Sequence, residues 1–315
     1  MRFERLILLA ALGLVVLVLM SGPGSAQAPG GGQGAGQGGA PNGAQPGTND
    51  AATMPIFDAH MHYNQEPNPF YSLDQVLAVF GRNNVKGVLA TSRPNKGTHQ
   101  LMDATAQDQA RDKAKGLWVV PFIRPYRVRA DIQTWFGDPL SIELIESEFR
   151  RGYYRGVGEF HLYGKAAWNP VVKRIVDFAV ANDLYLHAHA DEEALLILFA
   201  HHPKAKIIWA HTGFSTAPAR VAALLDQYPG LWGELSYRGG ITGPGRALTA
   251  EWRDLFARYS DRFLLGSDTW INERWASYDD TMNEYRGWLR QLPREQAQRI
   301  AWGNAQKLFG AARVD

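Results

Sequence analysis

Short runs of β-forming residues alternate with helical stretches along most of this chain, and this alternation constrains the fold more than any other feature. Eight such runs follow residue 50, at 56–63, 85–92, 117–126, 155–163, 184–190, 206–213, 231–237 and 262–268. Strands that alternate with helices indicate βαβ units and a parallel sheet, and eight units in one domain favour a closed barrel. We therefore predict an α/β fold, a (β/α)8 TIM barrel built as a single domain.

A doubly wound open sheet is the alternative arrangement of the same elements. It predicts a glycine-rich phosphate-binding loop directly after the first strand. The sequence there is Asp58-Ala59-His60-Met61-His62, which contains no glycine. The part of the chain after residue 50 is also close to the about 250 residues typical of an eight-fold barrel.

The first 53 residues have a composition unlike the rest of the chain. Arg2 and Arg5 precede an apolar stretch at 6–20 and small residues up to Ala28, the pattern of a cleaved signal peptide. An uncleaved membrane anchor is the competing interpretation, but this stretch is shorter than the about 20 residues that span a bilayer. Residues 29–53 are rich in Gly, Gln and Pro and predict a disordered linker. We expect a signal peptide at 1–28, the linker at 29–53, the barrel at 54–311, and export to the periplasm or the medium.

Charge and cysteine content exclude several functions. The chain has 33 basic and 31 acidic residues, a net charge of +2, which gives no general reason to bind nucleic acid. It has no cysteine, so disulfides, thiolate metal sites and a cysteine nucleophile are all excluded. We expect a small-molecule substrate, no nucleic-acid partner and no membrane association of the mature form; the oligomeric state stays open.

Most histidines of the chain lie near the ends of the predicted strands, where barrel enzymes carry their chemistry. A single histidine is more often an ordinary hydrogen-bonded residue than a metal ligand, but here six of nine share this position. The six are His60, His62, His161, His187, His189 and His211, and the carboxylates of Glu159 and Asp268 occupy similar positions. Residues two apart on a strand point to the same side, so His60 and His62 can face one ion. Imidazole and carboxylate ligands suit Zn²⁺, or alternatively Mn²⁺ or Fe²⁺.

Several segments together resemble the metal-dependent amidohydrolase superfamily, and most closely its amidohydrolase-related (amidohydrolase 2) branch. The resemblance covers about residues 55–309, and its motifs are Asp58-Ala59-His60-Met61-His62, Gly156-Val157-Gly158-Glu159-Phe160-His161, His189-Ala190-Asp191, Trp209-Ala210-His211-Thr212-Gly213 and Gly266-Ser267-Asp268. It implies the barrel scaffold and a divalent metal. It does not fix the reaction, because members range from hydrolases of amides and lactones to non-oxidative decarboxylases.

The chain departs from many of these relatives on the fourth strand. They carry a lysine that becomes carboxylated and bridges two metals, whereas this chain has Glu159. The number of ions, one or two, is therefore open. On the fifth strand His189 is the preferred ligand because it lies nearer the mouth, and His187, one layer deeper, is its alternative.

These residues predict a metal site with a proton shuttle. The expected ligands are His60, His62, His189, Glu159 and Asp268, although Glu159 is equally suited to orient a histidine from behind. A metal so held lowers the pKa of a bound water toward about 7. Asp268 is expected to move protons, and His211 either binds the metal or polarises a substrate carbonyl.

Several cations near the strand ends predict an anionic substrate, since arginine binds carboxylates through two parallel hydrogen bonds. The candidate substrate-binding residues are Arg93, Arg124, Arg127, Arg238 and His161. We therefore expect a metal-dependent hydrolase of a lactone, amide or ester in a small anionic compound. A metal-dependent decarboxylase is the first alternative, and a non-catalytic exported metal- or ligand-binding protein is the second.

Overall fold

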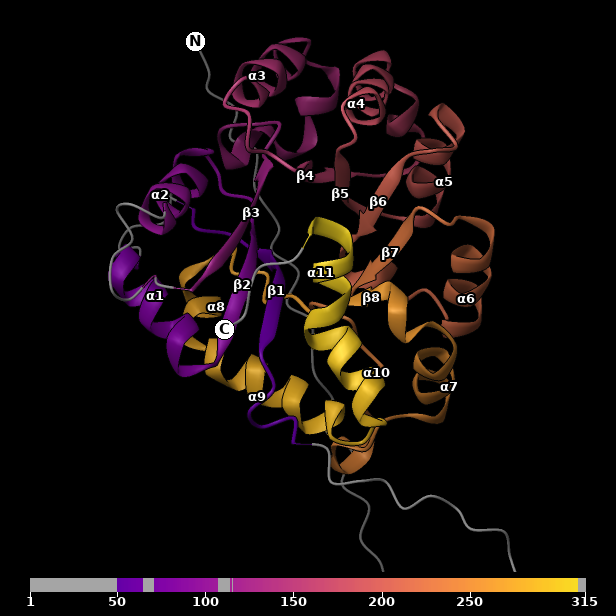
Figure 1. The fold of residues 1–315 in the computed structure, drawn as a ribbon. Coiled ribbons are helices and arrows are strands. Elements are labelled where there is room, and N and C mark those ends of the chain that lie inside the picture. Colours follow the sequence, from indigo (N-terminus) through magenta and orange to yellow (C-terminus); the bar gives the residue numbers. More distant parts are fainter. Residues whose placement is uncertain (1–49, 65–70, 107–113, 115, 311–315) are drawn as a thin grey trace, which may run out of the picture. The chain divides into compact units, whose positions relative to one another are not determined.

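Eight parallel strands form a nearly closed barrel in the computed structural model, which describes residues 50–64, 71–106, 114 and 116–310 (Figure 1). The strands are β1 (Ile56–Met61), β2 (Val85–Ala90), β3 (Trp118–Ile123), β4 (Gly156–Leu162), β5 (Tyr185–Ala190), β6 (Lys206–Trp209), β7 (Leu231–Glu234) and β8 (Phe263–Leu264). Each strand pairs with the next along the chain. A bridge between Asp58 and Leu265 joins the last strand to the first, and Ala59 N donates to Leu265 O at 2.7 Å. The eight predicted runs all contain a strand, and the arrangement is consistent with a TIM barrel.

Helices surround the strands (Figure 1). They are α1 (Leu73–Arg82), α2 (Lys96–Thr105), α3 (Leu140–Phe149), α4 (Pro170–Ala181), α5 (Glu192–His201), α6 (Pro218–Gln227), α7 (Ala250–Tyr259), α8 (Asn272–Ala276), α9 (Tyr278–Leu289), α10 (Arg294–Gln298) and α11 (Asn304–Phe309). Local sequence explains where several begin. The side chain of Asn169 caps α4 and Pro170 takes its first position, while Ser72 and Gln75 form a capping box on α1.

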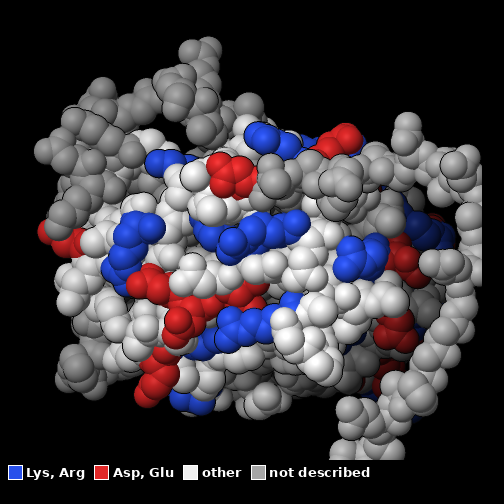
Figure 2. Space-filling view, turned by 90° about the horizontal axis from the view of Figure 1, so that it is seen from below, with Lys and Arg blue, Asp and Glu red and all other residues white. Residues whose placement is uncertain are grey.

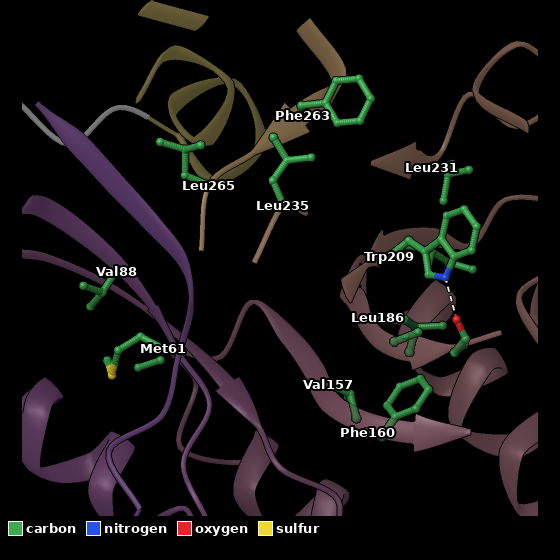
Figure 3. Packing of buried hydrophobic residues seen from close by; sticks show 14 of the residues in the cluster. Met61, Val88, Val157, Phe160, Leu186, Trp209, Leu231, Leu235, Phe263 and Leu265 are labelled. Atoms are coloured by element: carbon green, nitrogen blue, oxygen red, sulfur yellow. Dashed lines mark hydrogen bonds between the residues drawn. The ribbon is translucent and has the colours of Figure 1, made fainter. Parts of the chain in front are cut away.

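Apolar side chains on the outer faces of the strands pack against the surrounding helices. Figure 3 shows this layer, with Met61 and Val88 from β1 and β2 and Leu186 from β5. Trp209 is fully buried there, and its indole Nε1 donates to the Ala190 carbonyl at 2.7 Å. The layer fixes each strand against its helix, so that the residues at the strand ends are held on a rigid frame.

The C-terminal helix α11 closes one end of the barrel with aromatic side chains. The Phe309 ring lies 5.9 Å from that of Phe57, 6.5 Å from Trp118 and 5.3 Å from Tyr185, between ring centroids. These three partners stand at or near the first residues of β1, β3 and β5. The end of the barrel at which the strands begin is therefore packed with apolar groups, and polar chemistry is confined to the other end.

Several strands are shorter than the predicted runs because the backbone turns at their ends. The predicted run 206–213 ends as a strand at Trp209, and His211 and Thr212 then adopt left-handed conformations with φ of 57° and 44°. Asp268, which follows β8, has φ of 49°. Non-glycine residues take such conformations rarely, and they cluster at functional sites.

The predicted signal peptide lies outside the described residues, as does most of the predicted linker. The described residues include the last ones of that linker, and there Ala51 is buried and its carbonyl accepts a hydrogen bond from Arg286. In the part of the chain that the structure describes, no helix is both long and apolar enough to cross a membrane. On the face seen in Figure 2, basic and acidic side chains lie interspersed.

Candidate metal centre

Four buried side chains converge at the end of the barrel opposite α11. They are His60 in β1, His62 directly after it, Glu159 in β4 and Asp268 after β8. The Nε2 atoms of His60 and His62 are 3.1 Å apart. Asp268 Oδ1 lies 3.5 Å from the first and 3.1 Å from the second, and the two Glu159 oxygens lie 3.4 and 3.3 Å from them. Ligand atoms at about 2.0–2.2 Å from a shared ion have comparable mutual separations.

Hydrogen bonds at the Nδ1 atoms show where the ring protons of both histidines lie. In each ring Nδ1 is the outer nitrogen, and Nε2, which faces the other histidine, is the inner nitrogen. His60 Nδ1 lies 2.9 Å from Glu234 Oε2, and His62 Nδ1 lies 2.5 Å from the Thr91 carbonyl oxygen. A carbonyl or an ionised carboxylate only accepts, so both Nδ1 atoms donate and both Nε2 atoms carry lone pairs in the neutral rings. Two lone pairs facing each other at 3.1 Å repel unless a proton or a metal ion lies between them. The donor set thus fits a divalent metal ion.

The charges of the cluster lead to the same conclusion. Burial lowers the pKa of His60, but the carboxylates of Asp268, Glu159 and Glu234 outweigh it and hold that pKa well above its usual value. Burial raises the pKa of Asp268, yet His60 and a hydrogen bond with His62 bring it below the ordinary value. The carboxylates stay ionised although they are buried, which leaves the cluster in need of positive charge from protons or from a metal.

His189 and His211 both lie near the Oε1 atom of Glu159. His189 Nδ1 is 2.9 Å from Glu159 Oε1 and 3.2 Å from His211 Nε2. His211 Nδ1 donates to the Ser236 carbonyl at 2.8 Å, so its Nε2 accepts. A proton on His189 Nδ1 satisfies both contacts. Hydrogen bonding between neutral rings therefore accounts for this pair, whereas the pair formed by His60 and His62 needs an added proton or a metal ion.

His187, the alternative ligand on β5, lies one layer below the cluster. Its ring centroid is 4.4 Å from that of His60, and neither ring nitrogen has a hydrogen-bond partner among the described residues. Burial holds its pKa well below the usual value, so the ring is neutral. The structure places His189 rather than His187 beside Glu159.

A cavity of about 430 Å³ opens over the cluster. Glu159, His189, His211 and Asp268 contribute to its wall. The rest of the lining combines cations with apolar and aromatic groups: Arg93, Arg124, Arg129, Ile132, Gln133, His161, Phe214, Tyr237 and Trp270. The cavity thus joins a candidate metal site to a surface that suits an anion with an apolar part.

Three of the five predicted substrate-binding residues line this cavity. Arg93 is buried in its wall. Arg124 Nη1 pairs with Glu159 Oε2 at 3.1 Å and Nη2 donates to the Tyr126 hydroxyl at 2.7 Å, so much of its guanidinium holds the cluster in place. His161 stacks on His189 with ring centroids 4.1 Å apart, and burial lowers its pKa to about 3, so the ring is neutral.

The other two predicted arginines are not brought to the cavity. Arg127 is exposed and lines a separate hollow. Arg238 lies over the Trp252 ring at 4.9 Å and donates to the Thr216 carbonyl. It follows Tyr237, which has a left-handed backbone with φ of 50°. A position shortly after a strand is therefore not sufficient to place a side chain in the site.

Among the residues of the site that were not predicted from the sequence are Glu234, Ser236 and Arg129. Glu234 and Ser236 contact the outer nitrogens of the histidines, and Arg129 lines the cavity. A carboxylate inside the apolar run 231–237 is a signal that could have found Glu234, because a buried acid needs partners. Arg129 lies in a short helical turn (Arg129–Gln133) after β3, and no sequence pattern distinguishes it.

Comparisons with known proteins give a family and structures of similar fold. A family model described as amidohydrolase matches residues 57–311. A search of curated proteins finds no match. An amidohydrolase from Burkholderia multivorans with bound HEPES is 17% identical, with 82% of this chain and 100% of that chain covered and a TM-score of 0.54. The zinc-bound form of the same protein is 19% identical over the same shares, with a TM-score of 0.53. A TatD homologue from Escherichia coli is 15% identical, with 83% and 100% covered and a TM-score of 0.58.

Proposed function

The chain belongs to the amidohydrolase family and is a hydrolase of that type, and from this premise we propose that it cleaves a lactone, amide or ester bond in small anionic compounds. The observation that carries the proposal is the convergence of the His60 and His62 Nε2 atoms, 3.1 Å apart, with two buried, ionised carboxylates. The site lies in the wall and floor of a cavity with three arginines. A cation-binding centre under an anion-binding surface is suited to metal-assisted attack on a carboxylate-bearing substrate.

We assign one divalent ion to His60, His62, Asp268 and Glu159. Zinc is the first choice because of the mixed nitrogen and oxygen donors, and the zinc-bound Burkholderia protein shares the fold; manganese and iron are the alternatives. When bound, such an ion supplies Lewis acidity that makes water a competent nucleophile near neutral pH. A single ion is favoured because His189 and His211 are satisfied by hydrogen bonds.

Asp268 is the proton carrier of the proposed reaction. Its Oδ1 faces the two histidines while the residue also lines the cavity, and its pKa below the ordinary value keeps it ionised at neutral pH. The oxygen of water attacks the carbonyl carbon while Asp268 takes the proton that is lost. The carboxyl group then returns this proton to the leaving oxygen or nitrogen as the bond to the carbonyl carbon breaks.

The contacts of His211 support one of the two roles considered for it. Its Nδ1 proton is used by the Ser236 carbonyl, so Nε2 has no proton in the neutral ring. Burial lowers the pKa of His211, which favours that neutral form. A ring without an inner proton cannot donate a hydrogen bond to a substrate carbonyl. This supports His211 as an acceptor or ligand at the edge of the site rather than as the group that polarises the carbonyl.

The proposal is tested with purified protein loaded with Zn²⁺ or Mn²⁺ and a panel of lactones, esters and amides, each with and without a carboxylate. Reactions run in ¹⁸O-labelled water are analysed by mass spectrometry, and aromatic carboxylic acids are added with detection of CO₂. We expect ¹⁸O in the product acid and faster turnover of the carboxylate-bearing members. Release of CO₂ without ¹⁸O would establish the decarboxylase instead, and metal binding without any turnover would establish a binding protein.

Substitution of Arg129 tests the anion-binding surface. We expect Arg129→Ala to raise KM for carboxylate-bearing substrates about 10- to 100-fold, because a hydrogen bond to a charged group contributes about 1.5–3 kcal/mol. Neutral members of the panel are expected to change little. The matched control is Arg127→Ala, since Arg127 is two residues away but lines a different hollow. Equal KM changes for charged and neutral substrates would refute the assignment of Arg129.

We also propose export to the periplasm or the medium, supported by the residue pattern at 1–28. Mass spectrometry of the protein from fractionated cells is expected to give a mature chain that begins at residue 29. An intact first residue in a cytoplasmic fraction would refute export.

A further inference from the structure

Glu234, at the end of β7, contacts both His60 and His211 through its carboxylate. Its Oε2 lies 2.9 Å from His60 Nδ1, 3.1 Å from the backbone N of His211 and 2.9 Å from Ser236 Oγ. Its Oε1 accepts from the backbone N of Ser236. Glu234 is completely buried, and its pKa lies below the usual value because His60 and His211 outweigh the effect of burial.

All of these neighbours act as donors toward Glu234. The two backbone amides can only donate, and Ser236 Oγ and His60 Nδ1 have protons to give. Glu234 faces the outer nitrogen of His60, on the side away from His62 and Asp268. It is therefore placed to orient His60 as a metal ligand, and not to bind the ion beside His62 itself.

We propose that Glu234 is a positioning residue that prepares both sides of the metal centre at once. It keeps the proton of His60 on Nδ1, which leaves the Nε2 lone pair directed at His62 and Asp268. It also holds the left-handed backbone of His211, whose φ is 57°, through the amide of that residue. The part of this inference that concerns metal binding rests on the proposed function. The part that concerns the positions of His60 and His211 rests only on contacts within the chain.

A glycine next to β8 supports the same assignment. A Cβ atom at Gly266 would lie 2.2 Å from Glu234 Oε1 and 2.5 Å from His60 Cβ. Separations this short do not occur between unbonded atoms, so a side chain at 266 would displace the carboxylate or the histidine. The space that Gly266 leaves is thus filled by Glu234 and His60.

The first test is the substitution Glu234→Gln. An amide has one acceptor oxygen, so it cannot accept on both sides as the carboxylate does. Turned one way, its NH₂ faces the backbone N–H of Ser236, so the side chain must shift; turned the other way, it faces His60 Nδ1, and the proton of that ring must move to Nε2, into the metal site. We expect the dissociation constant for Zn²⁺, measured by competition with a chromogenic chelator, to rise about 10- to 100-fold. The visible spectrum of the Co²⁺-loaded variant is expected to differ from that of the wild type, a change that loss of stability alone would not cause.

A second variant disturbs the position of the Glu234 carboxylate without removing it. Gly266→Ala is expected to weaken Zn²⁺ binding in the same direction, because the new methyl group displaces Glu234, His60 or both. Gly287→Ala is the matched control, since a Cβ at this exposed position in α9 meets nothing within 4 Å. Zinc affinity in this control is expected to stay at the wild-type value.

A crystal structure of metal-free Glu234→Gln decides the geometric part of the inference. We expect the His60 ring to be rotated or the turn at His211 to be displaced. Unchanged positions of both would overturn the inference whether or not the protein binds metal. A wild-type affinity for Zn²⁺ in Glu234→Gln would overturn its role in metal binding, whereas a wild type that binds no Zn²⁺ would instead overturn the proposed function.

Discussion

Asp268→Asn is expected to lower kcat about 10²- to 10⁴-fold while the protein keeps its metal, because general acid and base catalysis contributes about this much. The amide has the size of the carboxyl group but cannot take a proton from water at neutral pH. Its oxygen can still occupy the position of Oδ1, 3.1 Å from His62 Nε2. The fold should tolerate the change, because Asp268 has φ of 49° and asparagine adopts such conformations readily.

The measurement combines steady-state kinetics on any member of the panel that the wild type cleaves with the metal content of the same sample. Asp183→Asn is the matched control. Asp183 also has a left-handed backbone, with φ of 56°, but its side chain is 96% exposed and remote from the cluster. Its substitution is expected to leave kcat unchanged. Full activity in Asp268→Asn would refute the proton-carrier role, and loss of metal would show that Asp268 acts chiefly as a ligand.

His62→Ala is expected to weaken Zn²⁺ binding by more than about 100-fold, because loss of a group that only orients a ligand already costs about 10- to 100-fold. The substitution removes one of the two facing lone pairs, so the remaining donors no longer enclose the ion. Activity at limiting Zn²⁺ is expected to fall in proportion to the occupied fraction. Excess Zn²⁺ should restore only part of it, since one ligand is missing.

Chelator competition and activity titrations measure both effects. His202→Ala serves as the control, because His202 lies just after α5 and before the start of β6, at the end of the barrel opposite the cluster. It is expected to bind Zn²⁺ as the wild type does. Wild-type affinity in His62→Ala would mean that the ion, if present, lies elsewhere.

Much of the site could be predicted from the sequence, because the side to which a strand residue points and the place where a strand ends both depend on the local sequence. His60 and His62 share a face for reasons of backbone geometry alone, and they do meet at 3.1 Å. Glu159 and Asp268 come from distant strands, yet the barrel brings all strand ends to one mouth, so their meeting follows from the fold.

The parts that could not be predicted depend on the backbone after each strand. Arg238 follows a left-handed residue and turns toward Trp252, while Arg129 returns to the cavity from a helical turn. Neither path leaves a periodic pattern in the sequence. Glu234 was missed for a different reason, since its role depends on which donors surround it, and these come from β1, from the turn after β6 and from Ser236.

The metal content of the purified protein tests the central claim most directly. Elemental analysis by mass spectrometry after incubation with Zn²⁺ and gel filtration is run on the wild type and on the double variant His60→Ala/His62→Ala. The structure predicts about one ion per chain in the wild type and none in the variant. A wild type that stays free of metal and cannot be loaded with Zn²⁺ or Mn²⁺, or a double variant that retains the ion, would contradict it.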